Sequence, residues 1–572
     1  MDEIDDAELE VVLAQACSDA ATGDFQSIVS VASALRAEAG DEDDPRRALI
    51  AALEYHLTLP EERRGAHGPF GPMIETSKGS YPAPVGTVDG LIPGTYQLWE
   101  RAAALAPLDL VKARFLDLLW VARFGDQPHQ FVGAAIDAYI TAASGGFGHP
   151  VERSEALQRA VELASQTRDR DRRGRAVTAT VAMIEAAIAS EDRMPGVALP
   201  LLAMLVGDRP DRRPSELEQL VQKAIDRFGD DPWNLQAALE LQARLVPPEE
   251  RKALHERQVE GFRELASQTT GLVRYSHLQH AIELAEGFGL HGLADSLRHE
   301  VEAITEDELE LKEFSAEVSL PREQVDRYID WFVGKDDLES ALRRFGSHIP
   351  SGDPDKNRQQ VEELMAEHPI QYLFTRMTIG PNNSLTRSTQ GPDAQAEQAL
   401  IDREAQQASL FSLFAVEILE RIRERYGPIA ANTDWLKSDL IDVSVASKIR
   451  RAIELYEADD PDSAASVLAP RLERIVRRLA SAVGLTVTRS PDRHGRSGGV
   501  KGLGDLLGTL EGFLPEPTRR YLKVLLSEVT GLNLRNRIGH GLDDEIAKRE
   551  AALLIHAVCH ARLLVPTEGS AS

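Results

Sequence analysis

The chain has 572 residues, of which 42% are apolar and 27% are charged, and this balance excludes a chain that is disordered throughout. Its length corresponds to roughly three or four domains of about 150 residues each, so a single compact domain is not expected. The two cysteines, Cys17 and Cys559, lie near opposite ends of the sequence, which excludes a disulfide framework and a cysteine-built zinc site.

No segment has the length and apolar character of a membrane-spanning helix. The longest apolar run, 197–206, contains Pro200 and is much shorter than the roughly 20 residues that span a bilayer. The first residues are acidic, whereas a secretory signal begins with basic residues. We therefore expect a soluble, cytoplasmic protein in a reducing compartment, with no membrane partner.

Acidic residues are concentrated in the front of the chain. The formal net charge is −28, which by itself argues against a polyanionic partner. Residues 439–566, however, contain 19 Lys and Arg against 17 Asp and Glu, so this segment is close to neutral. A C-terminal module with clustered arginines can therefore face a phosphate backbone, while the acidic front is expected to bind a protein partner.

Residues 1–95 are predicted to contain N-terminal helices and a long loop. The loop covers 65–94 and is rich in Gly and Pro, which disfavour a helix. A segment of this composition is expected to pack on the surface or to be partly mobile.

Apolar residues at helical spacing dominate 96–380. Stripes from Ala281 to Phe288 and from Leu293 to Val301, separated by a glycine turn, predict a helical hairpin. Further helices are predicted over 151–166, 175–190, 215–227, 235–246 and 249–268. Antiparallel helices joined by short breaks predict an α-solenoid-like array, with an irregular all-α domain as the alternative because no consensus recurs at a fixed period. Trp120, Trp233 and Trp331 lie within helical patterns and are interpreted as core anchors.

The main domain boundary is placed in 380–393, which has the polar, turn-forming composition of a connector. Connecting helices are expected over 394–438, and a C-terminal helical domain over 439–566. A second loop, 490–499, is basic and is expected to be flexible. Exposed basic loops usually have no specific role, so contact of this loop with RNA stays an alternative.

The most informative segment is 531–542, which reads GLNLRNRIGHGL. If this segment is helical, Asn536 and His540 are four residues apart and share a face, with Arg535 beside them. An arginine offers a planar pair of donors to phosphate oxygens. A histidine titrates near neutral pH, so it can accept a proton from a ribose 2′-hydroxyl or donate one to a leaving 5′-oxygen. Asparagine can orient either group, and this chemistry requires no metal.

Two amphipathic helices flank the segment. The first carries Pro517 in its first turn, where proline is favourable, and the second is expected to be capped by Asp543 or Asp544. The predicted buried residues are Tyr521, Leu522, Leu525, Leu526 and Val529 in the first helix, and Leu553, Leu554, Ala557, Val558 and Ala561 in the second.

The run RNRIGH, from Arg535 to His540, resembles the Arg-polar-x-x-x-His signature of HEPN (higher eukaryotes and prokaryotes nucleotide-binding) domains. These all-α modules occur in many prokaryotic toxins and defence ribonucleases. The helix LAPRLERIVR, at 468–477, and the later NLRNRIGHGL resemble the two halves of a HEPN-type domain at the C-terminus of large bacterial proteins of unknown function. The resemblance covers 439–566, and 113–120 has a vaguer similarity to helical regions that accompany such domains.

The resemblance implies RNA cleavage without metal or cofactor, in a composite cleft formed by two copies of the domain. His540 would be the general base or acid, Arg535 would bind the scissile phosphate, and Asn536 would position the reacting groups. Arg537 lies inside the motif but outside its defining positions, so it would be an auxiliary phosphate contact. The products would be a 2′,3′-cyclic phosphate and a 5′-hydroxyl. The expected partners are therefore RNA and a second copy of the C-terminal domain.

A structural interpretation of the same residues stays open. Arg535 can pair with Glu473 or Glu528 inside the bundle, while His540 ends a helix and Gly541 permits the turn. The module would then bind nucleotides or dimerise without catalysis, or it would be an inert bundle behind a protein-binding scaffold.

Other candidates are weaker. His556 and His560 have metal-ligand spacing but lack an intervening carboxylate, so they are interpreted as surface histidines, with His556 pointing further toward solvent. The glycines of GVKGLG, at 499–504, are interpreted as a flexible entry to a helix at Leu503 rather than a phosphate loop. Arg474 and Arg478 are neighbours on one helix face and are predicted to flank an RNA path, whereas Arg477 is one turn from Glu473 and is expected to pair with it.

These observations predict an all-α protein with a helical-repeat-like N-terminal array and a C-terminal HEPN-type helical bundle. The array would restrain the nuclease until a trigger relieves it, because an unrestrained ribonuclease would injure its host.

Overall fold

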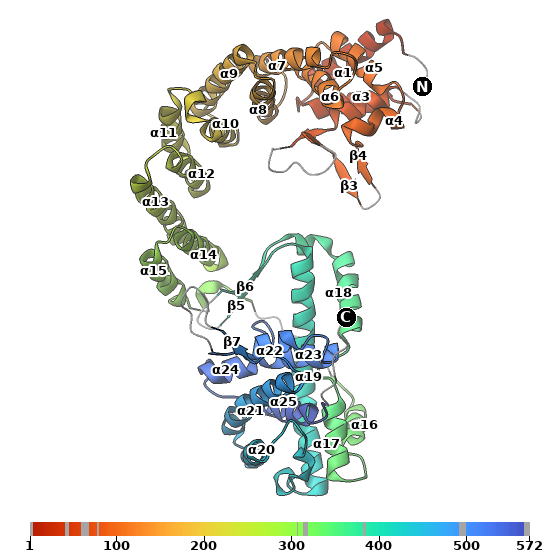
Figure 1. Cartoon of the computed structure of the whole chain (residues 1–572), viewed down its shortest axis with the longest axis vertical. Helices are drawn as coiled ribbons and strands as arrows, with labels where there is room; N and C mark the ends of the chain where they lie inside the picture. The colour runs from red at the N-terminus through yellow and green to blue at the C-terminus, as the bar shows by residue number, and fades with distance from the viewer. Residues whose placement is uncertain are drawn as a thin grey trace. The chain divides into compact units, whose positions relative to one another are not determined.

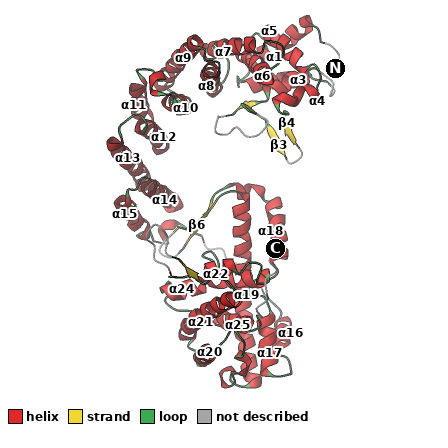
Figure 2. Cartoon of the chain, in the orientation of Figure 1, coloured by secondary structure: helices red, strands yellow, loops and turns green. Residues whose placement is uncertain are grey.

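The structure is a computed structural model of the chain and describes residues 4–40, 45–58, 68–76, 79–305, 307–312, 319–380, 385–490 and 499–564. Helices dominate these residues, and the described strands form two-stranded antiparallel sheets (Figure 2). The all-α prediction is therefore confirmed. The chain divides into two compact units, 1–298 and 299–572, so the segment 380–393 lies inside the second unit.

The first unit begins with helices that share one core. They are α1 (Asp6–Thr22), α2 (Ile28–Glu38), α3 (Arg46–Leu53), α4 (Val88–Leu91), α5 (Thr95–Leu105) and α6 (Asp109–Ala122). Between α3 and α4, β1 (His56–Leu57) pairs with β2 (Phe70–Gly71), and β3 (Ile74–Thr76) pairs with β4 (Gly79–Tyr81). The predicted loop 65–94 therefore contains strands and a short helix in its described part, because short extended segments tolerate the Gly and Pro that a helix interior excludes.

The next helices stack into an array. They are α7 (His129–Ser144), α8 (Pro150–Gln166), α9 (Arg170–Ala189), α10 (Pro195–Gly207), α11 (Leu217–Phe228), α12 (Pro232–Ala243), α13 (Pro248–Ser267), α14 (Gly271–Gly287) and α15 (His291–Glu302). Consecutive helices from α7 to α14 pack on one another, and α8, α10, α12 and α14 line the inner side of an arc (Figure 1). Four of these helices begin with proline, whose missing N–H has no partner in a first turn.

The predicted helices of this region are confirmed. The five ranges given above correspond to α8, α9, α11, α12 and α13, and the predicted hairpin corresponds to α14 and α15. The interpretation of the tryptophans as core anchors is wrong at two positions. Trp233 is 52% exposed and Trp331 is 58% exposed, because the neighbouring helices leave each side chain partly uncovered, whereas Trp120 is half-buried.

The second unit is a helical bundle with one core. Its helices are α16 (Arg322–Val333), α17 (Leu338–Ser347), α18 (Pro354–Glu367), α19 (Pro392–Tyr426), α20 (Val443–Glu457), α21 (Pro461–Ala482), α22 (Leu503–Thr509), α23 (Glu516–Leu526), α24 (Leu534–His540) and α25 (Lys548–Ala561). The long helix α19 packs against α16, α17, α18, α23 and α25, and α25 also packs against α21. The expected connecting helices over 394–438 are thus mostly one helix, α19, followed by the 3-10 turns η7 (Ile429–Ala431) and η8 (Asp434–Leu436).

Two segments of this unit differ from their predicted form. The connector 380–393 belongs in part to a hairpin in which β5 (Arg376–Ile379) pairs with β6 (Leu385–Thr389), and α19 begins at Pro392. Residues 381–384 lie outside the described part. The alternating residues of β6 permit an extended strand in spite of its polar composition. The loop 490–499 joins β7 (Thr488–Arg489) to β8 (Gly499–Val500), and 491–498 lie outside the described residues.

The helices on either side of the motif largely follow prediction. Their predicted buried residues are buried except Val529, which is 51% exposed because α23 ends three residues earlier, at Leu526. The expected cap at Asp543 or Asp544 is wrong, since α25 begins at Lys548 and the Glu550 side chain accepts a hydrogen bond from the Ala547 N–H. Among the described helices, none combines the length and apolar character required to span a membrane.

Candidate functional site: the α24 motif

The predicted catalytic trio lies on the short helix α24, which packs against α21 and α23. Asn533 precedes the helix in the left-handed conformation, with a φ of 50°, and Gly541 follows it with a φ of 62°. Asparagine and glycine are the residues that adopt this conformation most readily. Asn533 and Gly541 therefore set the two ends of α24, and the trio lies between the turns that they form.

Arg535 is anchored by a carboxylate from another helix. Its Nε donates to Oε2 of Glu473 on α21 at 2.7 Å, and its Nη1 donates to Oδ1 of Asn536 at 2.9 Å. The Arg535 side chain is 31% exposed, and among the described residues its Nη2 has no hydrogen-bond partner. Glu473 also accepts a hydrogen bond from Arg477, as predicted from their spacing. The guanidinium of Arg535 is thus fixed on two sides and open on the third.

Asn536 links the trio to the start of α24. Its Nδ2 donates to Oδ1 of Asn533 at 2.8 Å, while its Oδ1 accepts from Arg535. Both ends of the amide are therefore used to orient the arginine. Asn533 is buried, and sequence reasoning missed its role. An asparagine three residues before another asparagine, at a helix start, is the signal that indicates such a pair.

His540 is the last residue of α24 and is exposed. Its imidazole forms no hydrogen bond with any described residue. A Cβ added to the neighbouring Gly539 would lie 3.9 Å from Nη1 of Arg535, so the guanidinium reaches the turn of α24 that carries the imidazole. Arg535 and His540 therefore lie on one short helix, with the partly buried guanidinium near the turn that ends in the exposed histidine.

Arg537 joins α24 to α25 through two ion pairs. Its Nε lies 2.8 Å from Oδ2 of Asp543, and its Nη1 donates to Oε1 of Glu550 at 3.1 Å. Burial opposes the charge of Arg537, but the hydrogen bonds and charges of these two carboxylates outweigh it and raise the arginine pKa. Contact between Arg537 and RNA would compete with both ion pairs.

Arg474 and Arg478 lie on an exposed face of α21, and both bind Oδ2 of Asp442, at 2.9 and 3.0 Å. Asp442 caps α20 by accepting a hydrogen bond from the Val445 N–H, and this bond together with the two arginines lowers the pKa of the carboxyl group. One carboxylate thus balances two guanidinium groups. Both side chains are partly exposed, and the same helix carries Glu473, which binds Arg535.

His556 and His560 are buried, which contradicts their interpretation as surface residues. Nδ1 of His556 lies 2.8 Å from the hydroxyl oxygen of Tyr521. His560 donates from Nδ1 to the Gly346 carbonyl at 2.7 Å and accepts at Nε2 from the Thr518 hydroxyl at 3.1 Å. The periodicity of α25 is apolar on nearly every face, so helical spacing alone did not distinguish its outer side.

No group of three or more His, Cys, Asp or Glu residues with metal-binding geometry occurs within the described ranges. The glycines of GVKGLG lead into α22, for which Gly502 is the N-terminal cap, as expected. The two cysteines are buried, and burial raises the pKa of each thiol to about 12.

A known family matches the front of the chain. Residues 2–176 match a domain of unknown function, DUF7380. This range covers α1 to α8 and the first turns of α9, so it lies within the first unit and does not include the α24 motif. No curated protein matches the chain.

Proposed function

We propose that the second unit is a metal-independent endoribonuclease of the HEPN type. Its catalytic residues would be Arg535, Asn536 and His540. The observation that carries this proposal is the arrangement of Arg535, whose guanidinium is held by Glu473 and Asn536. Its Nη2 has no hydrogen-bond partner among the described residues, and the exposed His540 ends the same short helix. Because this donor is already oriented, it can bind a phosphate oxygen without a further loss of side-chain conformational entropy.

The proposed reaction transfers a phosphoryl group within the RNA. His540 accepts the proton of the ribose 2′-hydroxyl, and the 2′-oxygen forms a bond to phosphorus as the bond to the 5′-oxygen breaks. Arg535 stabilises the negative charge that develops on the phosphate oxygens. The leaving 5′-oxygen takes a proton from a general acid, and the products are a 2′,3′-cyclic phosphate and a 5′-hydroxyl.

A second copy of the chain would supply the missing acid. Two copies that face each other across α24 would place one histidine on each side of the linkage, one as base and one as acid. Leu542 and Val529 are 42% and 51% exposed at the two edges of the motif segment, and apolar side chains at these places suit a protein interface. Arg474 and Arg478, on the exposed face of α21, would then guide the RNA backbone toward the cleft.

One observation favours a non-catalytic alternative. The ion pair between Arg535 and Glu473 neutralises the arginine inside the protein, as in a motif that only shapes an interface. In that case the second unit would dimerise or bind a nucleotide, and the helical array would act as a protein-binding scaffold.

Incubation of the full-length protein with total RNA, followed by mapping of the cut ends, tests the proposal. We expect cleavage that persists in EDTA and ends that carry 2′,3′-cyclic phosphate. Replacement of His540 or Arg535 by alanine is expected to lower the rate at least a hundredfold, since acid–base catalysis and phosphate binding each contribute about that much. The matched control is His368→Ala, which removes an exposed histidine of the same unit at the end of α18.

The outcomes separate the two functions. Loss of cleavage in H540A, with unchanged folding and oligomeric state and with full activity of H368A, supports the nuclease. Equal rates for the native protein and H540A, or activity that EDTA abolishes, would contradict it. The role of the first unit as a restraint on cleavage, and service in defence or as a toxin, rest on this nuclease proposal.

A further inference from the structure

A half-exposed tryptophan stands on the inner layer of the array. Trp233, in the first turn of α12, is 52% exposed, and its ring lies edge-on to the buried Phe262 of α13 at 4.7 Å. Its ring centre also lies 4.8 Å from that of His280 on α14. The indole is thus fixed by two neighbouring helices although much of it is in solvent. Rigid, partly exposed tryptophans are the side chains that most often dominate protein interfaces.

The tryptophan belongs to a larger surface. Nε2 of His280 lies 3.2 Å from Oε1 of Gln236, which is on α12. Val273, 55% exposed, precedes His280 by seven residues and so lies on the same face of α14 two turns away. Trp233, Gln236, His280 and Val273 form what we call the α12–α14 surface. An aromatic and apolar surface with amide and imidazole groups suits an extended peptide segment.

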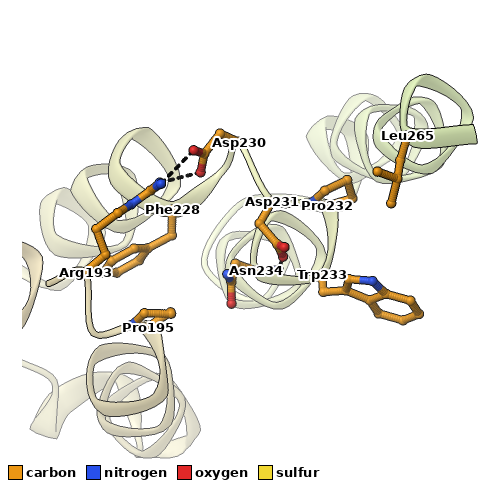
Figure 3. Close-up of a pocket in the computed structure, with 9 residues that line it drawn as sticks. All are labelled: Arg193, Pro195, Phe228, Asp230, Asp231, Pro232, Trp233, Asn234 and Leu265. Atoms are coloured by element: carbon orange, nitrogen blue, oxygen red, sulfur yellow. Dashed lines mark hydrogen bonds and ion pairs between the residues drawn. The ribbon is translucent and has the colours of Figure 1, made fainter. Parts of the chain in front are cut away.

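A hollow of about 440 Å³ adjoins this surface (Figure 3). Its lining includes Asp231, Asn234 and Trp233 from the start of α12, and Pro195 from the start of α10. Asp231 uses Oδ1 to cap α12 through the Asn234 N–H at 2.9 Å, and its other oxygen forms no hydrogen bond with a described residue. In Figure 3 the Trp233 ring projects from α12 on the side away from Arg193, so carboxylate and indole occupy different parts of the lining.

The charge of this region selects the partner. The inner helices α10, α12 and α14 contain three Glu and one Arg, and α10 has no charged residue at all. Residues 1–298 contain 47 Asp and Glu against 30 Lys and Arg, a net charge of −17. Burial lowers the pKa of His277 and His280, so neither adds positive charge at neutral pH. A cationic partner is therefore attracted and a polyanion such as RNA is repelled.

We propose that the α12–α14 surface and the hollow beside it bind an extended segment of another protein that carries arginine or lysine between apolar side chains. The apolar side chains pack on Trp233 and Val273. A guanidinium or ammonium group stacks on the indole or pairs with the open oxygen of Asp231, both of which are favourable contacts for a cation. This inference is independent of the nuclease proposal, because it concerns residues of the first unit alone.

A displayed library of random twelve-residue peptides, selected on the full-length protein, tests the partner chemistry. We expect selected peptides to be enriched in Arg or Lys next to Leu, Ile or aromatic residues. Fluorescence anisotropy with three selected peptides then measures affinity. Trp233→Ala is expected to weaken binding at least tenfold, and the matched control Trp331→Ala, which removes the exposed tryptophan of the second unit, is expected to leave it unchanged.

Two further variants allow the proposal to be tested even if W233A unfolds. Asp231→Asn preserves a good helix cap while it removes the charge, so a folded D231N protein should bind the cationic peptides at least threefold more weakly. Trp233→Phe retains an aromatic ring and should lie between the native protein and W233A. Selection of acidic peptides, failure to select any peptide above background, equal effects of W233A and W331A, or poly(U) RNA that competes with the peptides in a Trp233-dependent manner would each overturn the proposal.

Discussion

Nε of Arg535 donates to Oε2 of Glu473 at 2.7 Å, and this bond joins the motif helix α24 to α21 across 62 residues of sequence. Because Arg477 pairs with the same carboxylate, Glu473 stands between two guanidinium groups. The position of the arginine thus depends on a residue outside the motif. A helix of seven residues has little stability of its own, so α24 relies on contacts of this kind.

Glu473→Gln is therefore expected to loosen α24. The substitution keeps the shape of the side chain but removes its charge, and it should cost about 1.5–3 kcal/mol of stability, the range for a hydrogen bond to a charged group. Amide hydrogen exchange of 534–540 should accelerate, and any RNA cleavage should fall mainly through kcat. The control is Glu454→Gln, which alters a surface ion pair with Arg450 and should cost less than about 1 kcal/mol. Unchanged exchange in α24 would show that Glu473 does not position the motif.

A second prediction concerns pH. Burial lowers the pKa of His556 and His560 in the folded protein, and His348, packed nearby, is shifted in the same direction. The unfolded chain takes up these protons near pH 6.5, whereas the folded chain takes them up only at lower pH. Stability is therefore fully present above about pH 6.5 and decreases as the pH falls below it.

Unfolding of the second unit at pH 5 to 8, followed by hydrogen exchange in α25, measures this dependence. We expect His560→Asn to lower stability at pH 8, because the variant loses one of two hydrogen bonds. Between pH 6.5 and 5 the free energy of unfolding of H560N should also depend less steeply on pH. Because the variant has one titrating histidine fewer, the slope should decrease by up to about 1.4 kcal/mol per pH unit. His368→Asn should leave the slope unchanged. Parallel profiles for the native protein and H560N would contradict the assignment.

Local signals in the sequence were sufficient for most of the helices. Apolar residues at helical spacing predicted α8, α9 and α11 to α14 without any tertiary information, and proline stands in the first turn of α8, α12 and α13. Side-chain exposure was harder to predict, because it depends on which helices cover a given face. Trp233 was predicted to be buried, but its neighbours leave it exposed. His560 was predicted to be exposed, but Thr518 and Gly346, which are distant in the sequence, cover it.

Sequence spacing likewise predicted the local contacts of the candidate site but not its long-range ones. The motif spacing places Asn536 and His540 on one face if the segment is helical, and the structure shows that both lie on the short helix α24. The spacing of Glu473 and Arg477 indicated their pair. Which of two glutamates would hold Arg535 could not be determined from spacing. The structure selects Glu473, because Glu528 binds Arg387 and Lys523. Long-range pairs of this kind depend on the tertiary packing and carry no periodic signal.

Gly346 provides a test of packing between α17 and α25. A Cβ at this position would lie 2.5 Å from the backbone carbonyl carbon and oxygen of Cys559, so neither helix can accept it without a shift. Gly346→Ala should therefore lower the stability of the second unit by about 1–3 kcal/mol, as overpacking does. Gly508→Ala, in α22, meets no atom within 4 Å and should raise stability by about 0.5–1 kcal/mol. Urea unfolding of both variants measures the difference, and equal midpoints would refute the close approach of α17 to α25.

The last prediction concerns the buried ion pair of the first unit. Arg159 on α8 donates from Nε and Nη2 to both oxygens of Asp117 on α6, each at 2.8 Å, and the hydroxyl of Tyr139 on α7 donates to the same carboxylate. The Asp117 and Arg159 side chains are 0% and 3% exposed. Removal of the carboxylate leaves the buried Arg159 with the partly exposed Glu162 as its remaining ion-pair partner among the described residues, so Asp117→Ala should cost about 3–5 kcal/mol in the stability of the first unit.

The double variant Asp117→Leu/Arg159→Leu distinguishes burial of charge from loss of packing. Leucine at both positions removes both charges together, so this protein should be more stable than D117A, in spite of the larger change in sequence. Hydrogen exchange in α6, α7 and α8 under increasing urea gives the free energy of opening for each variant. The matched control is Asp230→Asn, in the exposed pair with Arg193, which should leave exchange in these three helices unchanged. If D117A and the double variant open at the same urea concentration, the charge of Arg159 is not what the carboxylate compensates, and α6 to α8 are held together by their apolar contacts alone.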